Sequence, residues 1–228
     1  MTTAPKPIDA AAPPVPDDAG MAEPAGTIRL KLAALGIDHR ASDFPVQFIE
    51  FCEQNDLYEM EVNAAGELLI LPMTGYRGNK QENYMNHFLV GWELANGGSA
   101  SSQTVRFRLP SGEIRGPDAA WITQERFDAL SEDEWNRIVE GAPDFVAEIR
   151  SRTDDLPPLR NKMALWMAAG ARLGWLIDTR SRQVYIYRAG QTEPEVLDNP
   201  EALDGEDVLP GFVFPVRQYV FDLAGPEE

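Results

Sequence analysis

Turn-forming residues divide this chain into short segments, and their spacing constrains the fold more than any other feature. Turns are predicted at 64–66, 96–98 and 110–112. Between the turns, apolar residues recur with the helical or the strand period, mostly over runs of strand length. No run approaches the roughly 18 apolar residues that a membrane span needs. The sequence therefore predicts an α+β fold of short elements and no membrane partner.

The periodic segments predict three longer helices and two antiparallel hairpins. The helices are expected over 43–55, 80–94 and about 157–169, and two short helices are expected after residue 122. Ser131 and Glu134 form a capping box that opens the second short helix. The strands are expected at 58–62, 67–71, 104–109, 113–115, 118–122, 144–151, 173–178 and 183–188.

Residues 1–26 differ in composition from the remainder of the chain. They contain seven Ala and six Pro and no aromatic residue. Such a segment buries too little apolar surface to offset its ordering entropy, so we expect it to be disordered. We expect residues 27–228 to form a single domain.

The chain has a formal net charge of −17, from 20 Lys and Arg against 37 Asp and Glu. Non-specific binding to nucleic acid depends on Lys and Arg, so this charge argues against a protein that coats DNA. It does not exclude a local site, because metal-dependent nucleases gather carboxylates around cations. Cys52 is the one cysteine, which excludes a disulfide framework. With no secretion signal recognised at the start of the chain, we expect a cytoplasmic protein of bacterial type.

The segment 144–151 carries the most informative chemistry. In a strand, Phe145 and Ile149 would pack inward, and Glu148 and Arg150 would share the other face. A carboxylate and a cation on one strand face suit metal-dependent phosphodiester hydrolysis, in which acids hold Mg²⁺ and a cation orients water or stabilises charge. The alternative is a cross-strand salt bridge, which the strand pattern by itself favours.

Two Pro-Asp pairs compete to supply a second acid beside Glu148. Asp144 precedes Glu148 by four residues on one strand, about 13 Å away. Oxygens bound to one Mg²⁺ must lie within roughly 4 Å of each other, so these two residues cannot share an ion. Asp118 lies on a separate predicted strand and can do so. We therefore choose Asp118.

An ordered series of motifs extends from about Phe48 to Leu223. It comprises Glu61-x4-Gly66-Glu67-Leu68, Pro72-x-Thr74-Gly75, Leu109-Pro110-x-Gly112, Pro117-Asp118-Ala119-Ala120-Trp121, Pro143-Asp144-Phe145-Val146-x-Glu148-x-Arg150-Ser151, Lys162-Met163, Leu173-Gly174-Trp175-Leu176-Ile177-Asp178, Val184-x-Ile186-Tyr187-Arg188 and Val208-Leu209-Pro210-Gly211-Phe212. The series resembles the Uma-two type of restriction-endonuclease-like protein, which belongs to the PD-(D/E)XK nuclease superfamily.

The resemblance implies a PD-(D/E)XK nuclease-like core, a mixed four-stranded β-sheet flanked by helices, to which the 58–71 hairpin is an N-terminal addition. It also implies that Asp118 and Glu148 are the metal ligands and that Glu61 is a third catalytic acid. The implied cofactor is Mg²⁺, for which Mn²⁺ could substitute.

The resemblance also bears on the catalytic cation. The superfamily's Lys normally stands two residues after the Glu, where this chain has Arg150, and in this family a Lys of the next helix matches Lys162. Lys can be tuned by burial and can orient a water, whereas Arg is permanently charged and clamps phosphate. We expect Lys162 to be catalytic rather than a solvated helix residue, and Arg150 to bind substrate. The family's Ser-Pro-Ser is replaced by 151–153, which adds Arg152 as a second substrate-binding cation.

These features predict a Mg²⁺-dependent endonuclease that hydrolyses DNA phosphodiester bonds. The rival hypothesis is a catalytically silent binding or scaffold module that kept the nuclease fold, which the acidic charge favours. We expect a homodimer, because many nucleases that cut duplexes place two active sites by symmetry.

Overall fold

The computed structural model describes residues 26–152 and 154–225. The expected disordered tail, apart from Gly26, lies outside the described residues. Two six-stranded sheets and a small two-stranded sheet make up the β-structure of the described chain. None of the described helices is long and apolar enough to cross a membrane.

The first sheet contains the expected N-terminal hairpin. Its strands, in spatial order, are β1 (Ile28–Lys31), β3 (Glu67–Leu71), β2 (Glu59–Val62), β6 (Ile114–Arg115), β5 (Arg106–Arg108) and β8 (Ile138–Glu140). Helix α1 (Phe44–Gln54) packs on this sheet through Phe44 and Phe48, which belong to the same apolar cluster as Val62 and Ile114. A short 3₁₀ helix, η1 (Leu32–Leu35), joins β1 to the segment before α1.

The second sheet is mixed. Its strands, in spatial order, are β12 (Glu195–Asp198), β11 (Gln183–Arg188), β10 (Leu173–Asp178), β9 (Phe145–Arg150), β7 (Ala119–Ile122) and β4 (Ser99–Ser102). Strands β9 and β10 are parallel and are joined through helix α5 (Leu156–Ala168), and the other pairs are antiparallel. Two prolines in the first turn of α5 suit a helix start, since their missing N–H groups would have no helical partner there.

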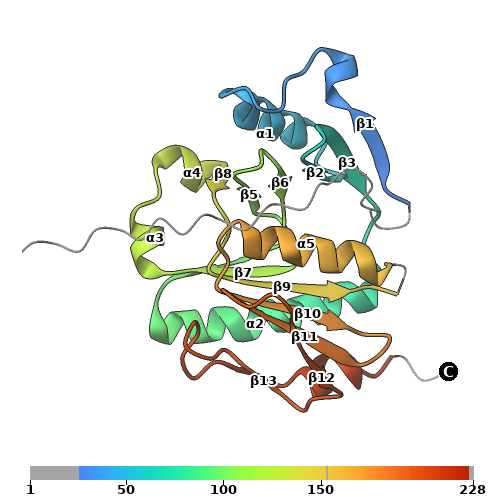
Figure 1. Ribbon diagram of the computed structural model, residues 1–228, viewed down its shortest axis with the longest axis vertical. Helices are drawn as coiled ribbons and strands as arrows, with labels where there is room; N and C mark the ends of the chain where they lie inside the picture. The colour runs from blue at the N-terminus through green and yellow to red at the C-terminus, as the bar shows by residue number, and fades with distance from the viewer. Residues whose placement is uncertain (1–25, 153, 226–228) are drawn as a thin grey trace, which may run out of the picture.

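Helices cover both faces of the second sheet, as Figure 1 shows. Helix α2 (Tyr76–Asn96) packs Met85 and Leu89 against the face that carries Phe145. Helix α5 packs Met163 and Trp166 against the opposite face. The sequence pattern predicted that only one face of β9 is buried, but all six residues of this strand are buried. Glu148 therefore points into the interior between β9 and α5.

The remaining elements are short. They are α3 (Gln124–Asp128), α4 (Glu132–Asn136), β13 (Leu203–Asp204), β14 (Val213–Phe214) and the π-helical turn η2 (Arg217–Phe221). The predicted capping box of Ser131 and Glu134 is present at the start of α4.

The sequence patterns missed several short edge strands. Strand β4 has the sequence Ser-Ala-Ser-Ser, without apolar alternation, and it forms because its backbone pairs with β7. Strand β12 is mostly exposed and likewise depends on pairing with β11. Hydrogen bonds to a neighbouring strand, rather than side-chain burial, define such edges.

Candidate active site

Residues of both large sheets, α2 and α5 line a cavity of about 530 Å³. Its side chains include six acids and one lysine, and we call this cavity the acidic pocket. These residues are Glu59, Glu61, Glu82, Asp118, Glu148, Asp154 and Lys162. The four residues that the sequence predicted as catalytic, at positions 61, 118, 148 and 162, all line it.

Asp118 and Glu148 come together through the pairing of β7 with β9. Ala119 is paired with Ala147 in this antiparallel ladder, so Asp118 lies across from Glu148 at the next position. Asp118 Oδ2 accepts a hydrogen bond of 2.6 Å from the backbone N–H of Ile149. The Asp118 side chain is thereby held beside the strand that carries Glu148.

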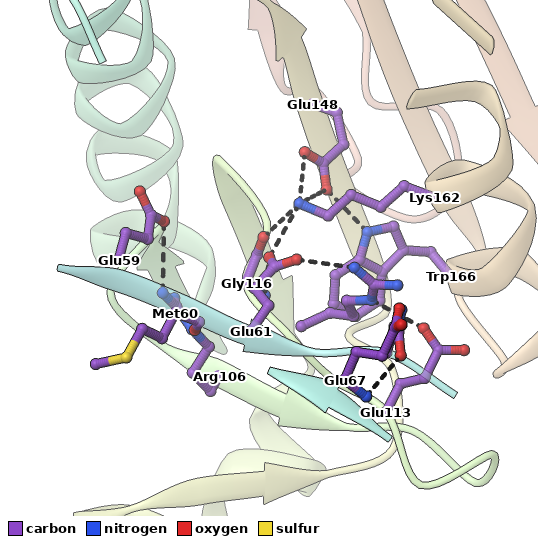
Figure 2. A network of polar contacts seen from close by, with 12 residues as sticks. Glu59, Met60, Glu61, Glu67, Arg106, Glu113, Gly116, Glu148, Lys162 and Trp166 are labelled. Carbon is purple, nitrogen blue, oxygen red and sulfur yellow. Dashed lines mark hydrogen bonds and ion pairs between the residues drawn. The ribbon is translucent and has the colours of Figure 1, made fainter. Parts of the chain in front are cut away.

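Lys162 lies between two of the acids, as Figure 2 shows. Its Nζ is 3.2 Å from Glu148 Oε1 and 3.3 Å from Glu61 Oε1. It also donates a hydrogen bond of 2.7 Å to the carbonyl oxygen of Gly116. Although burial alone would lower the pKa of Lys162, Glu148 and Glu61 raise it above the usual value for lysine. Lys162 is therefore an ammonium ion and cannot accept a proton near neutral pH.

Glu61 is held more firmly than the other acids. Its Oε1 accepts a hydrogen bond of 2.9 Å from the backbone N–H of Gly116, and its Oε2 lies 3.1 Å from Arg115. Burial alone would raise the pKa of Glu61, but Lys162 and Arg115 lower it to about 2. Glu61 is thus a permanent carboxylate whose oxygens already have partners.

Asp118 and Glu148 have the opposite electrostatic character. Burial raises the pKa of Asp118 to about 8, with a further contribution from Glu82. Burial also raises the pKa of Glu148 to about 8, and repulsion from Asp118 adds to this despite the nearby Lys162. The positive charge that the protein places near these two carboxyl groups is too small to keep their pKa values at the usual level.

The sequence interpretation missed Trp166 and Glu82 as residues of the site. The Trp166 indole N–H donates a hydrogen bond of 2.9 Å to Glu148 Oε1 and fixes this carboxylate. Trp166 follows Lys162 by four residues, and this spacing on one helix face could have indicated the pair. Glu82 of α2 also lines the pocket. No motif marks it, because its place depends on how α2 packs.

Arg150 does not line the acidic pocket. Its guanidinium bonds to both carboxylate oxygens of Asp178, at 3.0 and 2.9 Å, and its Nε donates to the Asp154 carbonyl. Asp178 is its paired residue on the neighbouring strand β10. This is the cross-strand salt bridge that the sequence left open as the alternative for this strand.

Other cations lie at the pocket instead. Arg152, which the sequence predicted as substrate-binding, lines the pocket and is exposed. Arg77 and Arg180 also line it and are exposed, and the sequence interpretation had assigned neither. These three arginines form the basic rim of an otherwise acidic pocket.

Asp144 is remote from this chemistry, as strand geometry predicted. Its carboxylate accepts from the backbone N–H of Thr123 and lies 3.1 Å from Arg126. These contacts of the Asp144 carboxylate link the start of β9 to the start of α3.

The acids of the pocket suit a hydrated divalent cation. Among the residues described, no three His, Cys, Asp or Glu side chains are grouped closely enough to hold a metal ion by themselves. Mg²⁺, however, usually keeps several waters and binds one or two carboxylates. Half-buried Asp118 and buried Glu148, with their raised pKa values, provide such a pair.

Comparisons with known proteins identify the family and the fold of the chain. The family Uma2, described as “Putative restriction endonuclease”, matches residues 45–217, which is more than half of the chain. A crystal structure of a putative nuclease belonging to DUF820 from Anabaena variabilis is similar, with a TM-score of 0.61 and 20% sequence identity. The match covers 71% of this chain and 89% of that one, and it shows a shared fold. No curated protein matches the chain.

Proposed function

Because the chain belongs to the Uma2 family of restriction-endonuclease type, we propose that it is a Mg²⁺-dependent endonuclease that hydrolyses DNA phosphodiester bonds in the acidic pocket. One observation carries the proposal. Lys162 and three acids, Glu61, Asp118 and Glu148, meet in a single cavity from four separate segments of the chain. Salt bridges that only support the fold would not leave the Asp118 and Glu148 carboxyl groups with raised pKa values.

Asp118 and Glu148 would hold the cation. When bound, it would neutralise charge on the phosphate and lower the pKa of a bound water. Lys162, as a permanent ammonium, would orient that water or stabilise the negative charge that develops on the phosphate. Glu61 and the Gly116 carbonyl position Lys162, and Trp166 positions Glu148.

The basic rim would bind the DNA backbone. Arg77, Arg152 and Arg180 are exposed beside the acidic pocket, where phosphates could reach them. Arginine contacts phosphate with two parallel hydrogen bonds. Three such residues can hold DNA locally despite the net charge of −17.

Cleavage of a circular plasmid tests the proposed function. We expect purified protein to nick or linearise plasmid DNA with Mg²⁺ or Mn²⁺ and to be inactive with excess chelator. The Asp118→Asn variant is expected to be inactive under all these conditions. Intact plasmid at every metal concentration would instead favour a catalytically silent module.

Divalent cations are expected to stabilise the folded protein. A ligand at a hundredfold excess over its Kd adds about 2.7 kcal/mol, which corresponds to about 5–10 °C in Tm for a chain of this size. We expect this rise with Mn²⁺ in the wild type and its loss in Asp118→Asn, measured by thermal melts. An equal rise in both proteins would refute a site shared by Asp118 and Glu148.

The same melts at several pH values provide a control. The pKa values of Asp118 and Glu148 are raised to about 8, so in the absence of metal this pair of carboxyl groups retains a proton below that pH. Cation binding must displace that proton. The Mn²⁺-dependent rise in Tm should therefore increase from pH 6 to pH 8.5. A rise that is independent of pH would point to a different site.

We also propose that the protein acts as a homodimer. Two active sites allow both strands of a duplex to be cut in one binding event, and a closed two-fold dimer supplies them without further assembly. Sedimentation velocity at micromolar concentration should show a species of twice the 25.3 kDa chain mass. A monomer alone, both with and without a DNA duplex, would contradict this proposal.

A further inference from the structure

We infer that Glu82 of α2 belongs to the cation site and holds a water ligand of the bound cation. The inference rests on the proposed function, since it concerns the same divalent cation. It adds a residue that neither the sequence motifs nor the spacing of the predicted ligands indicated. Glu82 would act on the cation through that water, as a positioning residue.

The first observation is an unpartnered buried oxygen. Glu82 is 6% exposed, and its Oε2 atom is buried without a hydrogen-bond partner. Burying a carboxylate oxygen without a hydrogen-bond partner costs free energy. Such oxygens are therefore rare unless a ligand supplies the missing partner. Glu82 lines the acidic pocket, where a ligand could reach it.

The second observation is that the structure holds Glu82 close to Asp118. Asn86, one helical turn after Glu82, donates hydrogen bonds to the carbonyl oxygens of both Glu82 and Asp118, at 3.0 and 2.9 Å. This side chain ties α2 to the start of β7.

The third observation is the charge balance of the pocket. Six acidic and four basic side chains line it, and two of the acids, Glu59 and Glu61, also have cationic partners behind the pocket wall in Arg106 and Arg115. Three of the basic side chains are the exposed arginines of the rim. The fourth, Lys162, already contacts Glu61 and Glu148. A divalent cation on Asp118 and Glu148 would bring positive charge close to Glu82 as well.

The geometry favours contact through water. No three acids among the described residues converge closely enough to bind one ion together. A cation on Asp118 and Glu148 would keep several waters. Glu82 Oε2 would accept a hydrogen bond from one of them, which satisfies this oxygen and fixes the orientation of the water.

The test measures Mn²⁺ affinity and hydration in the intact chain, without reference to cleavage. The variant Glu82→Gln keeps the shape of the side chain and removes its charge. Glu59→Gln is the matched control, because it makes the same change in the same pocket at a carboxylate that faces Arg106 at 3.4 Å. Kd comes from titration with Mn²⁺, and electron spin-echo measurements in oxygen-17 water count the water ligands.

We expect Glu82→Gln to weaken Mn²⁺ binding by about 10–100-fold, as removal of residues that hold metal ligands does. Glu59→Gln should lose much less affinity, and the number of water ligands should be the same in Glu82→Gln as in the wild type. Unchanged affinity in Glu82→Gln, or equal losses in both variants, would overturn the inference while leaving the proposed function intact. One additional water ligand in Glu82→Gln would overturn it too, since Glu82 would then bind the metal directly. A wild type that binds no Mn²⁺ would overturn both proposals.

Discussion

Replacing Lys162 with alanine is expected to lower kcat by about 10²–10³-fold, or about 3–4 kcal/mol, while DNA affinity changes little. The ammonium lies inside the acidic pocket against Glu148 and Glu61, where charge would develop during the proposed hydrolysis. The exposed rim arginines that would bind DNA remain in place. Single-turnover cleavage and equilibrium DNA binding measure the two effects separately.

Two further variants make this test specific. Lys162→Arg should not restore turnover, because a planar guanidinium cannot take the place of a compact ammonium between two carboxylates. Arg180→Ala should raise KM and reduce the salt dependence of binding, with kcat nearly unchanged. Full turnover in Lys162→Ala at saturating DNA would show that another cation is catalytic.

The loss of Lys162 also leaves two buried acids without their shared partner, which can destabilise the fold. Lys162→Gln retains a donor for the Gly116 carbonyl and serves as the second variant. Each measured rate is divided by the folded fraction of that variant, which its thermal melt provides. A loss of kcat per folded molecule in both variants is the expected result.

Replacing Arg150 with methionine is expected to destabilise the protein by about 3–5 kcal/mol. Asp178 is 1% exposed, and the change would leave its carboxylate buried without the guanidinium that contacts both oxygens. The remaining donors to Asp178, from Ser181 and the backbone of Arg180, would offset part of this cost. Urea unfolding measures the change in the free energy of unfolding.

Arg172→Met provides the matched control for Arg150→Met. The Arg172 side chain is 47% exposed and lies 3.9 Å from Asp144, so its loss should cost less than about 1 kcal/mol. Adding Asp178→Asn to Arg150→Met should recover part of the stability, because the buried charge is then removed. A stable Arg150→Met variant with weakened DNA binding would support the substrate-binding role expected from the sequence.

The sequence alone predicted much of the local structure and several of the site residues. The hairpin of β2 and β3, the strands β9 to β11 and the helices α1 and α5 all follow from apolar periodicity and turn residues. Asp144 could be excluded as a ligand of the same ion as Glu148, because the nearly constant rise per residue along a strand places the two residues too far apart. The motif series indicated Asp118, Glu148, Lys162 and Glu61, which the fold brings into one cavity.

Tertiary structure alone decided the partners of these residues. Arg150 faces Asp178 because the register of β9 and β10 places them side by side. The apolar pattern of each strand determines which face is buried, but it does not determine which residues of two distant strands lie side by side. Glu82 enters the pocket because α2 packs across β7 and β9. Periodicity reports which face of an element is apolar, but the approach of one element to another depends on the packing of the whole core. Three of the acids and the lysine could therefore be named from the sequence, whereas the contacts and charges around them could not.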